Sequence, residues 1–341
     1  MPSYISNSND RAPNTNSLKT WVLTMVIALT LLTSTEVYWR NHGHHPTIVD
    51  DKNLWSFHRE QVYSTETQKA VVLVGKSRIQ MGVDTQLFRE TFPKYKLIQL
   101  AIPGQAPLAT LRDLAFDRKF NGVVICSTKA LQFMPRYFNE QKFHIEHYYK
   151  YWNLNTKVNR IIATWFQEHL VLLSPNLKLT SIIDSFFNHS QPPKPSLSII
   201  HNDRSGSVNF QLIDNLQIEQ QKRANRVRTV YKNKKTLSPK KWLSQAKKTN
   251  LWVKMIQKRG GQVAFVRFPT SGDYYKYDEL TFPKKDYWDK FSAQSPGITI
   301  HFMDYSTLSH FTLPDLSHLD MKDKSKFTKE LLTILKQKKV L

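Results

Sequence analysis

Apolar residues gather in five short runs, each bounded by polar or turn-forming positions. The runs are Ala70–Val74, Lys96–Leu100, Val123–Cys126, Val263–Arg267 and Thr299–Phe302. Amphipathic stretches with apolar residues at helical spacing lie between them, among them Pro107–Asp117 and Lys241–Lys258. Because strands that alternate with helices pair in parallel, the pattern predicts an α/β fold with a doubly wound, five-stranded parallel sheet.

The third and fourth runs are separated by a much longer stretch than one strand–helix–strand crossover requires. Residues 138–173 are rich in aromatics and have a helical pattern, residues 190–207 are rich in Pro, Ser and Asn, and residues 217–248 are strongly basic. We expect residues 135–240 to form a mainly helical, basic insertion, with a loop at 190–207. This insertion is either a cap over the active-site edge or an interaction platform.

A different pattern, near the N-terminus, predicts a helix that crosses a membrane. No charged residue occurs from Trp21 to Thr35, and a helix of this length is about as long as the hydrocarbon core is thick. Trp21 at one end, with Tyr38 and Trp39 at the other, fits the aromatic belts of the two interfaces. Glu36 falls close to the second interface, where a carboxylate is tolerated.

A cleaved signal peptide is the alternative interpretation of this segment, with Arg11 and Lys19 as its charged region. No Ala-x-Ala cleavage pattern follows, so we favour an uncleaved signal-anchor. The chain then divides into a disordered cytoplasmic tail (1–19), a transmembrane anchor (20–39), a neck with a lead-in helix at Asn53–Tyr63 (40–67) and an α/β domain (68–341). The expected location is a bacterial inner membrane, with the domain facing the periplasm or the cell exterior.

The net charge of the chain limits the classes of binding partner that it suits. The chain has 49 Lys and Arg against 27 Asp and Glu, a net charge of +22, yet 40% of its residues are hydrophobic. It can therefore bury a core and is not a disordered basic chain. Nucleic acid, anionic lipid and acidic glycan all suit such a charge, but the anchor and the lack of a binding motif argue against nucleic acid. The run Lys222–Arg228, with Lys232, Lys234 and Lys235, is expected to be a solvated helix face.

The cysteine and a histidine cluster indicate little chemistry. Cys126 is the single cysteine, so no intramolecular disulfide can form, and its apolar run predicts a buried strand residue. His42, His44 and His45 are spaced as a short metal-binding run, but no carboxylate or cysteine accompanies them. We expect a solvated linker there, and a protein that uses no metal and no organic cofactor.

The residues with chemical potential follow the predicted strands, whose carboxyl ends form one edge of a parallel sheet. Residues 75–78 (GKSR) follow the first run, and Ser77 would begin a helix whose free N–H groups favour an oxyanion. Gly104 follows the second run, where its backbone N–H can approach a substrate as a second oxyanion donor. Asp315 and His318 follow the fifth run.

Ser77, His318 and Asp315 form a candidate catalytic triad. A serine hydroxyl needs a base near neutral pH, and His318 can take its proton while Asp315 holds the imidazole tautomer. Each motif is common when it occurs alone, and Asp315 could instead cap the helix expected at Lys324–Leu335. The order of the motifs behind the strands favours the catalytic interpretation, which points to ester hydrolysis or acyl transfer.

With these motifs the chain resembles the SGNH/GDSL hydrolase superfamily over residues 68–134 and 260–338. The GKSR block looks like the Gly-Ser-Ser-Arg variant of envelope-associated members, Gly104 matches the oxyanion glycine of the second block, and Asp315 with His318 matches the last block. The resemblance implies a flavodoxin-like three-layer α/β/α sandwich. The anchored layout is also similar to that of SGNH-like proteins of bacterial surface-polysaccharide O-acetylation and acyl transfer.

One block departs from the family pattern. The family's third block is usually Gly-x-Asn-Asp, whose Asn donates to the oxyanion, whereas residues 126–129 here read CSTK. The loss of one oxyanion donor typically costs about 10²–10³-fold in rate. Either Ser127, Thr128 or Lys129 substitutes for it, or the protein keeps the fold without the activity.

Three functions therefore stay open. The first is a membrane-anchored serine esterase or O-acyltransferase that acts on acyl esters, acetyl among them, of an envelope glycan, with Arg78, Thr128, Arg267 and Ser271 as possible substrate-binding residues. The loop that carries Ser271 is equally compatible with an ordinary polar turn. The second is an inactive SGNH-fold protein that binds acidic polysaccharide, lipid or a polysaccharide-assembly protein. The third, a nucleic-acid binder, is disfavoured by the anchor.

Overall fold

The computed structural model describes residues 17–188, 191–232 and 236–341. Its main sheet has five parallel strands: β1 Lys69–Val74, β2 Tyr95–Gln99, β3 Val123–Ser127, β6 Gln262–Arg267 and β7 Ile298–His301. Their order across the sheet is β2-β1-β3-β6-β7, which is the flavodoxin-like order. The predicted strands are confirmed, and the predictions for Arg11, Lys234 and Lys235 lie outside the described residues.

The helices of the described residues are, in chain order, α1 Ser17–Asn41, α2 Lys52–Arg59, α3 Ser77–Gly82, α4 Thr85–Thr91, α5 Leu108–Phe116, α6 Lys142–Tyr151, α7 Leu154–His169, α8 Leu179–Phe187, α9 Leu216–Lys232, α10 Pro239–Ala246, α11 Lys248–Lys258, α12 Gly272–Thr281, α13 Trp288–Ser292, α14 Ser306–Ser309 and α15 Lys324–Gln337. Two predictions need correction. The lead-in helix α2 ends at Arg59, and the single helix expected at Lys241–Lys258 is two helices that meet at Lys247.

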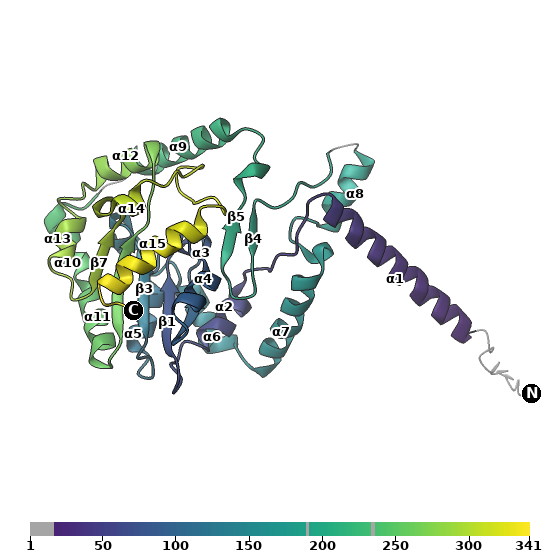
Figure 1. Cartoon of the computed structure of the whole chain (residues 1–341), viewed down its shortest axis with the longest axis horizontal. Helices are drawn as coiled ribbons and strands as arrows, with labels where there is room; N and C mark the ends of the chain where they lie inside the picture. The colour runs from purple at the N-terminus through teal and green to yellow at the C-terminus, as the bar shows by residue number, and fades with distance from the viewer. Residues whose placement is uncertain (1–16, 189–190, 233–235) are drawn as a thin grey trace, which may run out of the picture.

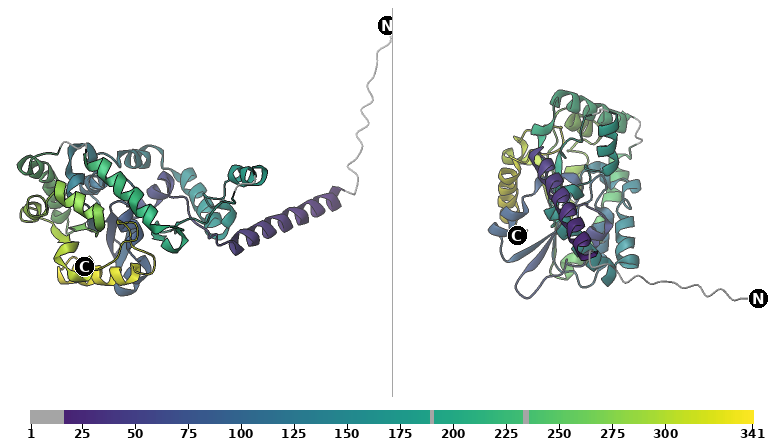
Figure 2. Two further views of the ribbon diagram at one scale, coloured as in Figure 1. Left: turned by 90° about the horizontal axis from the view of Figure 1, so that it is seen from above. Right: turned by 90° about the vertical axis from the view of Figure 1, so that its right-hand side faces the viewer.

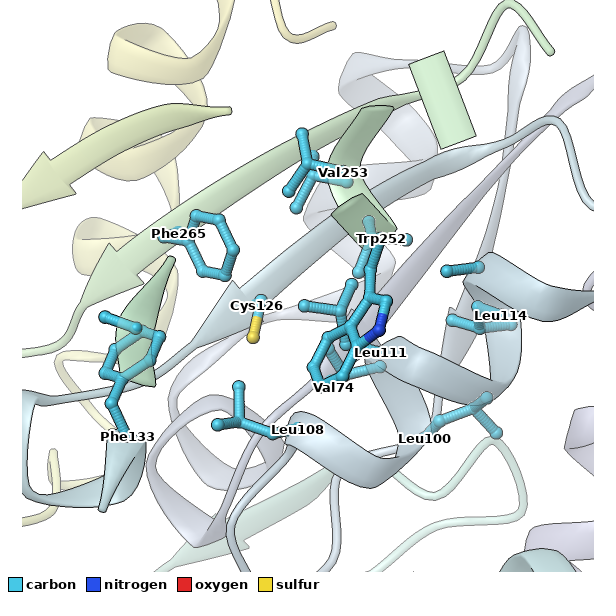
Figure 3. Close-up of a cluster of buried hydrophobic side chains, with 14 of the residues drawn as sticks. Val74, Leu100, Leu108, Leu111, Leu114, Cys126, Phe133, Trp252, Val253 and Phe265 are labelled. Carbon is cyan, nitrogen blue, oxygen red and sulfur yellow. The ribbon is translucent and has the colours of Figure 1, made fainter. Parts of the chain in front are cut away.

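The side chains of β1 alternate between two hydrophobic cores, so helices cover both faces of the sheet (Figure 1). Val72 and Val74 pack on the face that α5 and α11 cover, where Figure 3 shows Val74 in the same cluster as Trp252. Val71 and Leu73 pack on the opposite face, under α15. A strand buried on both faces is expected at the centre of a parallel sheet, and the result is a three-layer α/β/α sandwich.

Cys126 lies inside the first of these cores, as the sequence predicts. It is fully buried on β3 (Figure 3), and burial raises the pKa of its thiol. Because the thiolate is the reactive form, this cysteine is inert in the folded protein.

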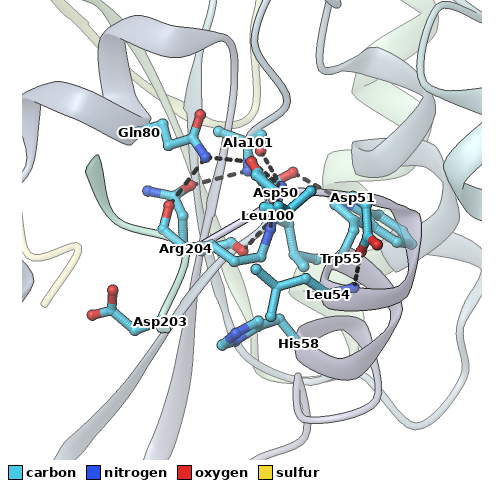
Figure 4. Close-up of polar contacts among 12 residues, drawn as sticks. Asp50, Asp51, Leu54, Trp55, His58, Gln80, Leu100, Ala101, Asp203 and Arg204 are labelled. Atoms are coloured by element: carbon cyan, nitrogen blue, oxygen red, sulfur yellow. Dashed lines mark hydrogen bonds and ion pairs between the residues drawn. The ribbon is translucent and has the colours of Figure 1, made fainter. Parts of the chain in front are cut away.

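The insertion between β3 and β6 is fastened to the edge of the sheet by one buried arginine. Residues 190–207 were expected to be a loop, but Ser198–Ile200 (β4) and Gly206–Val208 (β5) form an antiparallel hairpin. In its turn, Arg204 donates hydrogen bonds to the carbonyl oxygens of Gln99 (2.8 Å) and Ala101 (2.9 Å) and pairs with Asp50 at 2.7 Å (Figure 4). The guanidinium thus binds carbonyl oxygens at the carboxyl end of β2, an edge strand, and just after it.

Helix α1 projects away from the α/β domain (Figure 1, Figure 2). Among the described residues it is the one helix long and apolar enough to cross a membrane, and its most apolar window has no buried residue. One expectation at its domain end is wrong, because Trp39 is buried against Val171 and Leu177 rather than facing lipid. The carboxylate of Glu36, expected close to the second interface, accepts the backbone N–H groups of Val171 and Leu172.

The histidines that follow α1 do not form an entirely solvated linker either. His44 is buried against the ring of Trp39, with its Nε2 atom 3.0 Å from the carbonyl oxygen of Pro193. Burial is the main cause that lowers its pKa. The segment is therefore part of the joint between α1 and the insertion.

Candidate active site

Ser77, His318 and Asp315 meet at the carboxyl edge of the sheet. Ser77 is the first residue of α3, directly after the turn that follows β1, and its Oγ atom lies 2.8 Å from Nε2 of His318. The Nδ1 atom of His318 lies 2.8 Å from Oδ2 of Asp315. A carboxylate only accepts hydrogen bonds, so it assigns the ring proton to Nδ1 and leaves Nε2 free to accept the serine proton.

The loop that carries the last two residues is held by its own carboxylate. Oδ1 of Asp315 accepts the backbone N–H groups of Ser317 (3.0 Å) and His318 (2.7 Å). The alternative in which Asp315 caps α15 is wrong, because Asp323 occupies that position. The carboxylate therefore orients both the loop backbone and the imidazole.

Arg223, on helix α9 of the insertion, also contacts Oδ2 of Asp315. Burial alone would raise the pKa of this carboxyl, but the hydrogen bond from His318, with the charges of His318 and Arg223, outweighs burial and holds the pKa well below its ordinary value. Arg223 was expected on a solvated helix face, and its contact with Asp315 corrects that prediction. The buried Val227 and Tyr231 on α9 show that one face of the helix packs on the domain.

The turn before Ser77 depends on a glycine for close approach. A Cβ atom on Gly75 would lie 2.5 Å from Cγ2 of Ile79 and 2.9 Å from Cβ of Ser127, so no other residue fits without displacement. This close packing brings the start of α3 against the end of β3, where an oxyanion site is expected.

Gly104 lines the same pocket as Ser77 and has a backbone φ of +78°. L-residues with a side chain rarely adopt this conformation. Its carbonyl oxygen accepts a hydrogen bond from Nζ of Lys76 at 2.8 Å, which orients this peptide segment beside the nucleophile. The N–H of Ser77, in the first turn of α3, has no acceptor within that helix and is the other backbone donor candidate.

The third block carries no Asn, and Thr128 and Lys129 in this block make different contacts. Thr128 is buried and its N–H donates to the carbonyl of Val266 at 3.0 Å, while its Oγ1 has no partner in the described part of the chain. The ammonium of Lys129 pairs with Asp278 at 3.1 Å and contacts the hydroxyl of Tyr231 at 2.5 Å. Lys129 is thus held by its neighbours at the pocket wall.

Two pockets meet at Ser77 and His318. The first, here called the cationic pocket, has a volume of about 330 Å³. Its charged lining consists of one carboxylate, Glu140, and five cations, namely Lys76, Arg78, Lys129, Arg223 and Arg226. The excess of positive charge favours an anionic group beside the nucleophile.

The second, here called the apolar pocket, has a volume of about 310 Å³. Its apolar wall comes from α3 and from the insertion: Met81, Leu197, Val208, Phe210 and Ile213. Arg223 and Arg226 of α9 line both pockets. Figure 1 shows α9 running beside α12 along this edge of the sheet.

Tyr274 connects the cationic pocket to a buried ionic cluster. The guanidinium of Arg78 lies 4.8 Å from the centre of its ring, and its hydroxyl lies 3.3 Å from Nζ of Lys129. Burial acts to raise the pKa of this phenol, but the positive charges of Arg78 and Lys129 outweigh burial and lower the pKa to about 7. Asp278 lies at the centre of the cluster, where it binds both Lys129 and Arg267.

Of the four expected substrate-binding residues, one lines a pocket beside Ser77 and three do not. Arg78 lines the cationic pocket, and its Nε donates to Oγ of Ser317 at 3.1 Å. Arg267 is buried, pairs with Asp278 at 2.7 Å and donates to Thr270 at 3.0 Å. The backbone N–H of Ser271 donates to the carbonyl of Leu316 at 3.1 Å, so this residue supports the Asp315 loop from behind. Arg267, Ser271 and Thr128 are not among the residues that line the two pockets.

No metal-binding arrangement accompanies the site. In residues 17–188, 191–232 and 236–341, no three His, Cys, Asp or Glu side chains are grouped as metal ligands. The triad supplies a nucleophile, a base and a carboxylate from the protein itself, which is the set that acyl transfer through a serine requires.

No protein-family model and no curated protein matches this chain. Among solved structures it is similar to the one titled "Crystal Structure of TesA", at 10% sequence identity and a TM-score of 0.36, over 79% of this chain and 99% of the TesA chain. A likeness at this level does not indicate a family or a function. The fold assignment therefore rests on the strand order, and the site on the geometry of its residues.

Proposed function

We propose that this protein is an SGNH-type serine hydrolase or O-acyltransferase. The observation that supports this is the hydrogen-bonded chain from Oγ of Ser77 through His318 to Asp315, with both links at 2.8 Å. A nucleophile hydrogen-bonded to a base, which a third group orients in turn, is the arrangement of an activated serine.

The chemistry follows from these positions. Oγ of Ser77 attacks the ester carbonyl as Nε2 of His318 takes the hydroxyl proton, and the N–H groups of Ser77 and Gly104 stabilise the oxyanion. Collapse of the tetrahedral intermediate breaks the ester C–O bond, and the imidazolium returns the proton to the leaving alcohol. Water or a second hydroxyl then attacks the acyl-Ser77 ester by the same route, which regenerates the free serine.

The two pockets suggest which part of the substrate lies on which side. The apolar pocket suits an acyl group, and the cationic pocket suits an anionic alcohol or acceptor. With α1 as a single-pass anchor, we propose an acylated, acidic glycan of the bacterial envelope as the substrate, with the domain on the periplasmic or outer side of the inner membrane. Polysaccharide-assembly proteins are the expected partners.

A fluorophosphonate probe tests this proposal directly, because it labels only an activated serine. We expect the full chain to be labelled, and Ser77→Ala and His318→Ala to lose the label. Ser309→Ala, a change of an exposed serine on α14, is the matched control and should label like the wild type. Equal labelling of Ser77→Ala and the wild type would show that the proposed nucleophile is wrong.

One observation favours a second candidate, an inactive binding protein. The third block has no Asn, and the ammonium of Lys129 that could replace it is held by Asp278, Tyr231 and Tyr274. In that case the cationic pocket would bind acidic polysaccharide without turnover. A folded wild-type protein that takes no label, yet loses binding of an acidic polysaccharide on Arg226→Glu, would favour this candidate over the enzyme.

A further inference from the structure

The end of α1 and the turn between α7 and α8 form one joint. Glu36 is 9% exposed, and its carboxylate accepts the N–H groups of Val171 (2.8 Å) and Leu172 (3.1 Å). Arg40 pairs with Glu36 and donates to the carbonyl of His169 at 2.7 Å. These bonds join the end of α1 to the end of α7 and the turn after it, and Ile182 of α8 packs against Trp39 of α1 in the same joint.

Helix α8 has one broad apolar face, and part of that face is exposed. Ile182 contacts the cluster of Trp39, Val171 and Leu177 at the joint. Leu179, Ile183 and Phe187 are exposed by 71%, 45% and 72%. Their four-residue spacing puts these three side chains on one face of the helix, which is an apolar stripe that a soluble domain does not normally leave open.

Figure 1 and the left view of Figure 2 show α8 beside the end of α1 that enters the domain. A bilayer crossed by α1 would therefore begin at the level of this stripe. Amphipathic helices with one large apolar face lie in the plane of such an interface, with that face among the acyl chains. The joint thus carries the stripe to the surface of the membrane.

We propose that α8 lies in the interface of the bilayer that α1 crosses, with Leu179, Ile183 and Phe187 in contact with lipid. Two membrane contacts joined through Glu36 then hold the α/β domain in one orientation, instead of letting it swivel on the neck. The proposal rests on α1 as an anchor and does not depend on the catalytic proposal.

The test uses the full chain in liposomes of phosphatidylethanolamine and phosphatidylglycerol, with an environment-sensitive fluorophore on single introduced cysteines. Cys126 is fully buried, so the folded wild type serves as the unlabelled control. Phe187→Cys and Ile183→Cys probe the stripe, and Ser181→Cys, exposed on the opposite side of the same helix, is the matched control. We expect blue-shifted emission at 183 and 187, quenched more than about twofold by nitroxide-labelled lipid, and emission as in water at 181.

Two outcomes would overturn the proposal. Emission as in water at all three positions, with α1 inserted in the bilayer, would show that α8 stays in solvent. Blue-shifted emission at 187 that nitroxide lipid does not quench would show that protein, such as a second copy of this chain, covers the stripe. If Leu179→Ser abolishes the quenching at 183 and 187 and leaves the emission at the control position unchanged, the result would support contact through the whole stripe.

Discussion

The turns at the carboxyl edge of the sheet and the insertion between β3 and β6 both supply the candidate site, but different forces position their side chains. Ser77 directly follows the turn after β1, and Gly104 lies shortly after β2, so the sheet backbone places them. Arg223 reaches Asp315 from an insertion helix, across 92 positions of sequence. The ends of the strands therefore position the nucleophile and the oxyanion glycine, whereas the insertion determines the shape and charge around them.

The two regions are also held together in different ways. The strands of the sheet bury aliphatic side chains on both faces, whereas the insertion is attached through buried polar groups such as Arg204 with Asp50 and Tyr231 with Lys129. A buried ion pair adds little net stability, but it defines one geometry and is costly to break. Single substitutions can remove these polar contacts, whereas Val227 and Tyr231 also pack α9 on the core.

The largest expected effect comes from the contact that fastens the insertion to the sheet edge. Arg204→Met leaves Asp50 with only the amide of Gln80 as a donor and removes the arginine donor from the carbonyls of Gln99 and Ala101. Loss of one partner of a buried pair costs about 3–5 kcal/mol of unfolding free energy. Denaturant unfolding measures this. Arg89→Met is the control, because the Arg89 side chain is 49% exposed in its pair with Asp203, so its loss should cost only about 0–1 kcal/mol. Equal losses would show that the insertion is not fastened at Arg204.

A smaller effect is expected where the insertion touches the triad. Arg223→Gln removes one of the cations that lower the pKa of Asp315, but the carboxylate still binds His318 and two backbone N–H groups and stays ionised. It loses a contact that positions it, so kcat/KM should decrease roughly tenfold, or by about 1.4 kcal/mol, across the pH range. The measurement is the pH profile of ester hydrolysis.

The control for this change is Arg228→Gln on the same helix, whose guanidinium binds the hydroxyl of Tyr277 at 2.8 Å rather than the triad. Arg223→Lys should restore part of the wild-type profile, since the charge is retained. If Arg223→Gln and Arg228→Gln had identical profiles, the insertion would not influence the triad through Asp315.

The smallest expected effect is a spectroscopic one. Because the pKa of Tyr274 is lowered to about 7, one tyrosine should ionise near neutral pH, and its ultraviolet tyrosinate absorption should be absent from Tyr274→Phe. A folded-state pKa below the unfolded one stabilises the fold fully above the unfolded value, and this contribution fades as pH falls through about 7. Tyr277→Phe, on the same helix, should keep the absorption change near neutral pH. Loss of that change in Tyr277→Phe would show that Tyr274 is not the tyrosine that ionises.

The sequence was sufficient for the parts of the molecule whose pattern is local. Alternating apolar runs predicted all five strands of the main sheet and the parallel fold, and the residues after those strands predicted the Ser77–His318–Asp315 arrangement that the structure brings within hydrogen-bonding distance. The sequence also contains a pattern that indicates the packed face of α9. Val227 and Tyr231 stand one helical turn apart within the basic run, although net charge suggested a solvated helix.

Only the tertiary structure decided which distant groups complete the site. Nothing local marks Arg204 as the fastener of the β2 edge, Arg223 as the partner of Asp315, or Glu36 as an acceptor for two N–H groups beyond α7. Charged residues have no sequence periodicity that reports burial, because a charge is buried only when its partner happens to lie opposite. The pairing of such charges is a property of the folded chain, so the fold class and the candidate reacting groups were predictable, and the walls of the site were not.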